Sequence, residues 1–245
     1  MKKGKVYIAG AGPGDENLIS VRAMELVKQA DVIVYDRLAA ERFLQYANKE
    51  CEKINAGKQP QNHRLNQKQI NQVLIEKAKE GKKVLRLKGG DPFLFGRGGE
   101  ECEELQKAGI SFEVIPGISS FYSVCAYAGI PVTHRNCASS FHVFTGHRAE
   151  NEELDYKTIA NMEGTLLFLM SMNPAKPAAT RFLKKLFCTA GKSPDRRTKV
   201  FISAKQKAAM RIQRIPFCLC FMISAAFRAS ADNHSGNQPA YLPRF

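Results

Sequence analysis

The sequence lacks an apolar run that could cross a membrane. Its best candidate, residues 215–227, is shorter than the ~20 residues that a spanning helix needs. The first residues include lysines but no apolar signal region, since residues 6–10 already have the pattern of a strand. The seven cysteines form no Cys-x-x-Cys pair and show no Cys/His spacing typical of a metal site. We therefore predict a cytoplasmic protein with free thiols, no bound metal and no membrane contact.

Acidic residues are scarce in the last third of the chain. Residues 1–170 contain 23 Lys and Arg against 21 Asp and Glu, whereas residues 171–245 contain 14 against 2. The formal net charge of +14 therefore belongs almost entirely to the last third. A nucleic-acid-binding protein usually spreads its cationic residues over a folded face, with aromatic residues between them. The distribution argues against a nucleic-acid partner and indicates that the chain changes character near residue 170.

Strand-like and helix-like segments alternate over the first 170 residues. Short apolar runs are followed by stretches whose apolar residues recur at helical spacing. This alternation predicts an α/β fold in two domains, with a mostly parallel first sheet covered by helices on both faces. The expected domains are residues 1–116 and an incomplete 117–214, followed by an atypical, possibly disordered tail at 215–245. The expected strands are residues 5–9, 32–35, 84–87, 112–115, 141–144 and 165–169, and the expected helices are residues 18–30, 38–47, 70–78 and 100–108.

A glycine-rich loop follows the first expected strand. Its sequence, G-A-G-P-G-D at residues 10–15, lets backbone N–H groups approach a ligand where a strand leads into a helix. The spacing differs from the G-x-G-x-x-G dinucleotide fingerprint, Pro13 removes one donor, and no Gly-Lys-Ser/Thr of a P-loop follows. A nucleotide site and a plain tight turn both remain open at this point.

A second loop, residues 88–101, is richer still in glycine. It has five glycines in eleven residues, at the end of the strand expected at 84–87. That many glycines is costly for a simple connection, so the pattern favours a binding loop over a structural one. Asp91 is a candidate for holding hydroxyl groups, and Phe93 and Phe95 are candidates for covering an apolar or aromatic ligand.

These loops belong to a series of motifs in a fixed order. The series includes A-D-V-I-V-Y-D-R-L at residues 30–38, R-L-K-G-G-D-P-F-L-F-G-R-G-G-E-E at 86–101, P-G-I-S-S at 116–120 and G-T-L-L-F-L-M at 164–170. With these motifs the chain resembles the tetrapyrrole methylase superfamily from about Lys5 to Met170. The Tyr-Asp-Arg-Leu that contains Asp36 and the Gly-Arg-Gly-Gly of the second loop are most similar to its uroporphyrinogen-III C-methyltransferases.

The resemblance implies a homodimer of two-domain subunits, with the active site between the domains and S-adenosylmethionine bound there in a folded form. It also implies that Asp36 and Lys58 take part in proton transfer. Ser119-Ser120 stands where relatives often have Thr-Ala or Thr-Ser, which keeps one hydroxyl. The cofactor contacts that the resemblance implies are Pro13, Gly89, Gly90, Asp91, Leu94, Ser119, Ser120 and Met170.

The chemistry of methyl transfer is compatible with these residue types. A sulfonium methyl is already activated, so its transfer to an electron-rich pyrrole carbon mainly needs alignment and no metal. The methylated macrocycle is cationic and must lose a proton, for which a carboxylate such as Asp36 is a suitable acceptor. The tetrapyrrole also carries carboxylates that basic side chains are able to pair with. The candidates are Arg37, Lys58, Arg97 and Arg135, and each is equally well explained as a solvated or ion-paired surface residue.

The tail departs from the family pattern. After about residue 213 the sequence no longer resembles the family, and residues 230–239 show no periodicity. A reading-frame slip would explain this departure, because with permitted codons residues 232–239, read one nucleotide over, can give a string similar to the family's last strand. A divergent or disordered tail is the alternative. We expect no terminal strand from about residue 215 onward, and therefore low solubility and little or no activity.

Three functions remain open from the sequence. The leading one is S-adenosylmethionine-dependent methylation of uroporphyrinogen III at two ring carbons to give precorrin-2, on the route to sirohaem or cobalamin. The second is the activity of another precorrin methyltransferase. The third is a frame-shifted chain that binds its ligands weakly, or does not fold stably, and catalyses nothing.

Overall fold

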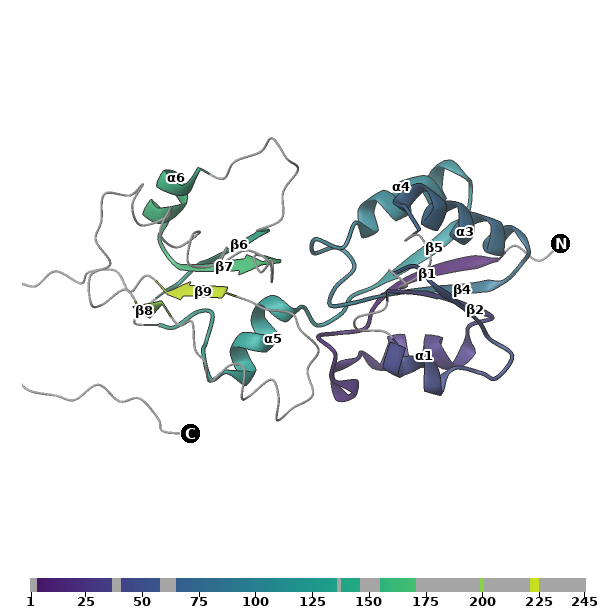
Figure 1. Ribbon diagram of the computed structural model, residues 1–245, viewed down its shortest axis with the longest axis horizontal. Coiled ribbons are helices and arrows are strands. Elements are labelled where there is room, and N and C mark those ends of the chain that lie inside the picture. The colour runs from purple at the N-terminus through teal and green to yellow at the C-terminus, as the bar shows by residue number, and fades with distance from the viewer. Residues whose placement is uncertain are drawn as a thin grey trace, which may run out of the picture.

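The computed structural model describes residues 4–36, 41–57, 65–135, 138–145, 155–170, 199–200 and 221–224. Two sheets form within these residues, one of five strands and one of four (Figure 1). The five-stranded sheet uses residues before position 116, and the four-stranded sheet uses residues after it. The predicted α/β fold with a mostly parallel first sheet is confirmed. The domain boundaries at residues 116 and 214 stay predictions.

The first sheet is parallel throughout, in the order β3-β2-β4-β1-β5. Parallel strands joined through helices place all their carboxyl ends at one edge of the sheet, and both glycine-rich loops begin at that edge. The strands are β1 (Lys5–Gly10), β2 (Val32–Tyr35), β3 (Glu52–Asn55), β4 (Lys83–Lys88) and β5 (Ser111–Ile115).

Helices cover both faces of this sheet (Figure 1). The helix α1 (Val21–Gln29) and the 3-10 helix η2 (Glu41–Tyr46) lie on one face, and α3 (Gln67–Lys79) and α4 (Gly98–Lys107) lie on the other. Alternation along β4 sends Leu85 and Leu87 into the core beneath α1, whereas Val84 packs with residues of α3 and α4. The same alternation places Arg86 and Lys88 on the face of α3 and α4.

Side-chain caps determine where the helices begin. Ser20 accepts a hydrogen bond from Ala23 N at 3.2 Å, so α1 begins at Val21 and is preceded by a separate 3-10 turn, η1 (Glu16–Leu18). Asn66 and Gln69 form a reciprocal capping box at the start of α3.

The prediction of an α-helix at residues 38–47 is wrong. Residues 41–46 form the 3-10 helix η2, and residues 37–40 lie outside the described ranges. Its last turn closes three residues back rather than four, with Ala47 N donating to Leu44 O at 3.3 Å. The segment is too short to gain the cooperativity of a longer α-helix.

The second sheet is mixed, in the order β6-β7-β9-β8. The strands β6 (Phe141–Thr145) and β7 (Thr165–Leu169) are parallel, and β9 (Phe221–Ser224) runs antiparallel to β7 and to β8 (Lys199–Val200). Two short helices, α5 (Ser120–Tyr127) and α6 (Tyr156–Asn161), belong to this part of the chain.

Strand β9 corrects the expectation that no strand forms beyond about residue 215. It pairs with β7 from Phe168↔Phe221 to Thr165↔Ser224. The expectation relied on the lack of two-residue alternation in this segment. A short apolar run is nevertheless sufficient for a strand that has hydrogen-bonded partners on both sides. The expectations of low solubility and of little or no activity concern the whole tail, most of which lies outside the described ranges, and they stay predictions. The frame-slip hypothesis otherwise concerns residues outside the described ranges and stays a prediction.

We expect slow amide hydrogen exchange at Phe221–Ser224, because β9 lies between two hydrogen-bonded neighbours. Hydrogen-exchange mass spectrometry on the full chain checks this. Replacing Met222 by Pro removes an N–H from the strand, and should speed exchange across β9 and in the paired residue Leu167. Exchange at residues 221–224 as fast as in an unfolded peptide would contradict the placement of β9.

Candidate active site

The two glycine-rich loops meet at the carboxyl edge of the first sheet. Gly12 and Gly90 form an antiparallel bridge, in which Gly90 N donates to Gly12 O at 2.8 Å and Gly12 N donates to Gly90 O at 3.3 Å. Ala11 N also donates to Lys88 O at 2.7 Å. Backbone hydrogen bonds therefore fasten the loop after β1 to the loop after β4. Pro13 follows the bridge as a buried residue.

Chain segments pack closely where these loops leave the sheet. A Cβ atom on Gly10 would lie 2.3 Å from Gly90 O, and one on Gly117 would lie 2.2 Å from the same oxygen. No side chain fits at such distances, so the segments after β1, β4 and β5 touch only because glycine occupies these positions.

Gly90 has a more open surrounding. Its φ is +65°, and among the described residues a Cβ atom there would meet one neighbour, Ser119 Cα, at 3.9 Å. The side of Gly90 toward which that Cβ would point, called the Gly90 face below, is therefore not filled by the described residues and lies next to the start of α5. Glycine leaves the loop backbone bare on that side, which suits the approach of a ligand.

Asp91 holds the β4–α4 loop in shape. Its Oδ1 accepts from Phe93 N at 2.8 Å, and its Oδ2 accepts from Gly117 N at 3.0 Å. The second bond ties the loop to the segment after β5. Each carboxylate oxygen accepts more than one hydrogen bond, so Asp91 retains capacity for a ligand hydroxyl.

The start of α5 borders the Gly90 face, and Leu94 of the β4–α4 loop packs with the end of β7. Ser119 and Ser120 begin α5 and are both buried, and the Ser119 side chain makes no capping hydrogen bond. Leu94, from the β4–α4 loop, packs with Val124 of α5 and Leu169 of β7. Leu94 therefore joins the β4–α4 loop to α5 and β7, which follow the first sheet in the chain.

Left-handed backbone is concentrated in these same segments. Among the residues that the structure describes, the non-glycine residues with positive φ are Phe95 at 53°, Arg97 at 60° and Met170 at 55°. Two lie in the β4–α4 loop, and Met170 directly follows β7. Such conformations cost on the order of 1–3 kcal/mol each and cluster at binding sites, where the surrounding structure imposes them.

Comparison with known proteins identifies the protein family of the chain. The sequence matches the protein family described as Tetrapyrrole (Corrin/Porphyrin) Methylases over residues 5–200. The chain belongs to this family. It is 48% identical over 195 residues to an S-adenosyl-L-methionine-dependent uroporphyrinogen III methyltransferase from Methanosarcina barkeri, covering 78% of this chain and 74% of that protein. It is 51% identical over 170 residues to a uroporphyrinogen-III C-methyltransferase from Methanocaldococcus jannaschii, covering 69% and 70%.

A solved structure of a tetrapyrrole methylase has the same architecture. The uroporphyrin-III C-methyltransferase of Thermus thermophilus, in complex with S-adenosyl homocysteine, matches with a TM-score of 0.63 at 36% identity, over 78% of each chain. A cobalt precorrin-4 methyltransferase matches with a TM-score of 0.70 at 23% identity, over 90% of this chain and 94% of the other, which supports the fold alone.

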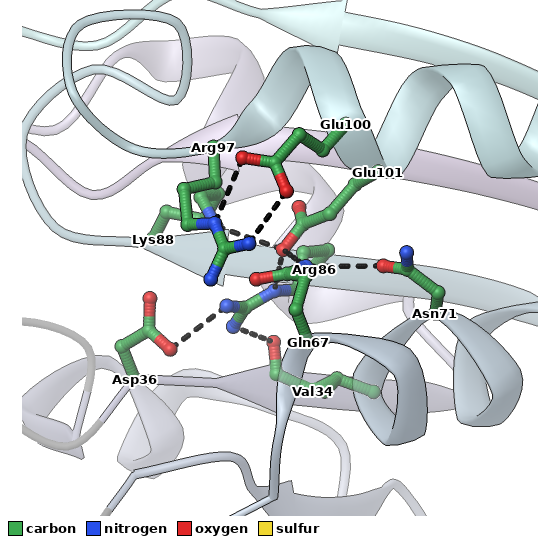
Figure 2. Close-up of polar contacts among 9 residues, drawn as sticks. All are labelled: Val34, Asp36, Gln67, Asn71, Arg86, Lys88, Arg97, Glu100 and Glu101. Carbon is green, nitrogen blue, oxygen red and sulfur yellow. Dashed lines mark hydrogen bonds and ion pairs between the residues drawn. The ribbon is translucent and has the colours of Figure 1, made fainter. Parts of the chain in front are cut away.

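A buried cluster of charged residues lies beside the loops of this tetrapyrrole methylase (Figure 2). Arg86, only 2% exposed, donates from Nη2 to Asp36 Oδ1 at 2.8 Å and from Nε to Glu101 Oε1 at 3.1 Å. Lys88 Nζ lies 2.9 Å from the same Glu101 oxygen. The cluster connects Asp36, at the end of β2, with β4 and the first turn of α4.

Opposite charges on neighbouring side chains of this cluster stabilise each other. Burial opposes the charge of Arg86, but Asp36 and Glu101 outweigh it and raise the pKa of the guanidinium. Burial and the neighbouring Arg86 charge lower the pKa of Lys88, although Glu101 and Asp36 oppose the shift. The two bases face two acids, so removal of any one member leaves a buried charge uncompensated.

The structure gathers most residues that the sequence singled out. Gly90 and Ser119 border the Gly90 face, Gly89, Asp91 and Leu94 belong to the same loop as Gly90, and Pro13 and Ser120 belong to adjoining segments. Met170 directly follows β7. Asp36 lies at the same edge of the first sheet, and its side chain is 40% exposed. Lys58 and Arg37 lie outside the described residues. Arg97, a candidate partner for substrate carboxylates, is already paired with Glu100 at 2.6 Å (Figure 2).

The described cysteines are not placed for catalysis. Cys51, Cys102 and Cys125 are buried, and burial raises the pKa of the Cys125 thiol to about 12. Within the described ranges no three His, Cys, Asp or Glu side chains form a group suited to a metal ion. No described helix has the length and apolar character required to cross a membrane.

Proposed function

We propose that this chain methylates uroporphyrinogen III at two ring carbons, with S-adenosylmethionine as donor, to give precorrin-2. The observation that carries the proposal is the Gly90 face, where the described residues leave room beside the backbone of the β4–α4 loop next to Ser119. The described residues that the family resemblance assigns to the cofactor belong to the loops after β1 and β4, to the start of α5 and to the position after β7. Two relatives that are 48% and 51% identical carry the name of this activity.

The residues present fit this cofactor. A Cβ atom on Gly90 would occupy the side from which a ligand reaches the loop, which accounts for glycine there. The residues that would hold the cofactor are Pro13, Gly89, Gly90, Asp91, Leu94, Ser119, Ser120 and Met170. S-adenosylmethionine, when bound, supplies an activated sulfonium methyl, so that the protein's contribution is alignment with the acceptor carbon.

Asp36 is the proton acceptor in this proposal. The methylated macrocycle is cationic and returns to neutrality by losing a proton to a nearby base. Asp36 is the exposed member of the charged cluster, and Arg86 occupies its Oδ1. Within the described ranges no hydrogen bond joins Oδ2 to another residue, so this oxygen is available to the substrate. Lys58, the second predicted proton-transfer residue, stays a prediction.

The homodimer is also a proposal, and the sequence prediction of a cytoplasmic location stays one. The exposed edge strand β6 supports an interface, because Phe141 is 41% exposed there and stacks on Phe121 at 5.6 Å between ring centroids. Tyr122, next to Phe121, is 40% exposed. Light scattering on the purified chain should give twice the monomer mass.

The activity is tested by incubating the purified full chain with uroporphyrinogen III and S-adenosylmethionine under anaerobic conditions. We expect mass spectrometry to detect a product carrying two added methyl groups. Methylation of a later precorrin, with uroporphyrinogen III left unchanged, would identify another precorrin methyltransferase instead. Recovery of all the tested tetrapyrroles without added methyl groups would overturn the proposal.

A further inference from the structure

Arg86 is an unusual residue for its position. It lies in β4, the central strand of the first sheet, among side chains that are otherwise apolar on β1 and β2. Its guanidinium donates to two carboxylates and to a backbone carbonyl, Val34 O at 3.4 Å (Figure 2). A charge this deeply buried is expensive, and a core aliphatic residue would serve the sheet equally well.

Glu101 also holds the guanidinium, and it accepts from a different nitrogen than Asp36 does. Its Oε1 accepts from Arg86 Nε, Lys88 Nζ and Gln67 Nε2, and Gln67 also donates to Asn71 Oδ1 at 3.0 Å. Glu101 itself is fully buried in the first turn of α4, where the helix dipole favours a negative charge. Arg86 is therefore held by Val34 and Asp36 at the end of β2 and by Glu101 of α4, and Gln67 of α3 in turn holds Glu101.

Asp36 differs from the rest of the cluster because 40% of its side chain is exposed. An exposed carboxylate at the end of a strand has several accessible rotamers. Arg86 Nη2 selects one of them by holding Oδ1 at 2.8 Å (Figure 2), and within the described ranges Oδ2 accepts no hydrogen bond. Proton transfer requires the acceptor oxygen within hydrogen-bond reach of the proton, so a fixed Oδ2 is an advantage.

We propose that Arg86, anchored by Glu101, is a positioning residue that fixes the Asp36 carboxylate for proton removal from the methylated tetrapyrrole. The inference rests on the proposed function, and in particular on Asp36 as proton acceptor. Arg86 itself touches neither cofactor nor substrate in this account, and it acts only through Asp36. The buried ion pair between Arg86 and Glu101 is retained because it fixes a geometry that the apolar core cannot supply.

The test removes the positioning group without leaving a net charge in the core. In the double variant Arg86→Met/Glu101→Gln one positive and one negative charge are lost, so that Lys88 still balances Asp36. Arg86→Lys is the second variant, because it keeps the charge but lacks the fork that reaches both carboxylates. The matched control is Arg22→Met/Glu25→Gln, an exposed pair on α1 whose closest atoms lie 3.6 Å apart.

We expect both cluster variants to lower kcat for tetrapyrrole methylation roughly 10- to 100-fold, the effect of a small displacement of a reacting group. The affinity for S-adenosylmethionine, measured by calorimetry, should stay within about twofold, and so should all parameters of the Arg22/Glu25 control. In an Asp36→Asn background the same cluster changes should have no further effect on kcat. A residue that only supports the fold would lower kcat in both backgrounds.

Three results would overturn the inference. The first is an unchanged kcat in a folded cluster variant, while Asp36→Asn is impaired. The second is an equal loss with and without Asp36, which would assign Arg86 a role independent of it. The third is full activity of Asp36→Asn itself, which would refute the proton-acceptor assignment and the inference with it. If the double variant does not fold, the Arg86→Lys measurement decides between these results.

Discussion

Replacing Asp36 by Asn should lower the turnover of uroporphyrinogen III about 10²–10⁴-fold, the usual loss when a general base is removed. The amide keeps a carbonyl oxygen that accepts from Arg86 Nη2, so this hydrogen bond is preserved while the basic oxygen and one negative charge of the cluster are lost. The affinity for S-adenosylmethionine should not change, because Asp36 is assigned to the tetrapyrrole. Steady-state kinetics with product analysis by mass spectrometry, together with calorimetry for the cofactor, separate the two effects.

Asp31→Asn is the matched control for this experiment. Asp31 precedes β2, at the opposite edge of the same sheet, and its Oδ2 accepts from Lys83 N at 2.7 Å. An amide oxygen is able to accept the same bond, so turnover should be close to that of the unmodified chain. If Asp36→Asn were as active as Asp31→Asn, the proton would leave by another route, and Lys58 would be the next residue to examine.

The sequence was sufficient to predict the first sheet because its central strands are short apolar runs separated by amphipathic helices. All four strands expected before residue 116 are present within a residue of their predicted ends. Strand β3 was missed because Glu52–Asn55 contains a single apolar residue and lies at an edge of the sheet. Helix α5 was missed for the opposite reason, since its apolar residues lie all round and give no periodic signal.

The glycine-rich loops were also predictable, but not the reason for each glycine. Spacing alone indicates a backbone that a ligand approaches. Only the strand order reveals that Gly10 and Gly117 are glycines because three chain segments touch. Gly90 differs from them because a Cβ atom there would make only an ordinary contact with the described residues. The distinction depends on distances between residues far apart in the sequence.

The charged cluster could not have been derived from spacing. Its members lie at positions 36, 86, 88 and 101, and their meeting depends on the register that pairs Val34 with Arg86 and on α4 packing over β4. One local signal was available, since an arginine inside the apolar run Val84-Leu-Arg-Leu87 is difficult to place without a buried acidic partner. Which acid supplies it is a property of the fold.

Gly90→Val should abolish binding of S-adenosylmethionine, because the new side chain would project from the Gly90 face between the β4–α4 loop and Ser119. The substitution also forces a β-branched residue to a φ of +65°, which strains the backbone wherever it occurs. Steric exclusion and strain must therefore be measured separately. Gly109→Val provides the comparison, since Gly109 has a similar φ of +68°, no heavy atom within 4 Å of its Cβ position, and a place between α4 and the start of β5.

Both valine variants should lose a similar free energy of unfolding, on the order of 1–3 kcal/mol, because they adopt the same strained conformation. Only Gly90→Val should lose the calorimetric signal of cofactor binding. Equal loss of binding in both variants would attribute the effect to general destabilisation. Unchanged affinity in folded Gly90→Val would show that the cofactor does not approach this face, and the cofactor assignment of the β4–α4 loop would then be wrong.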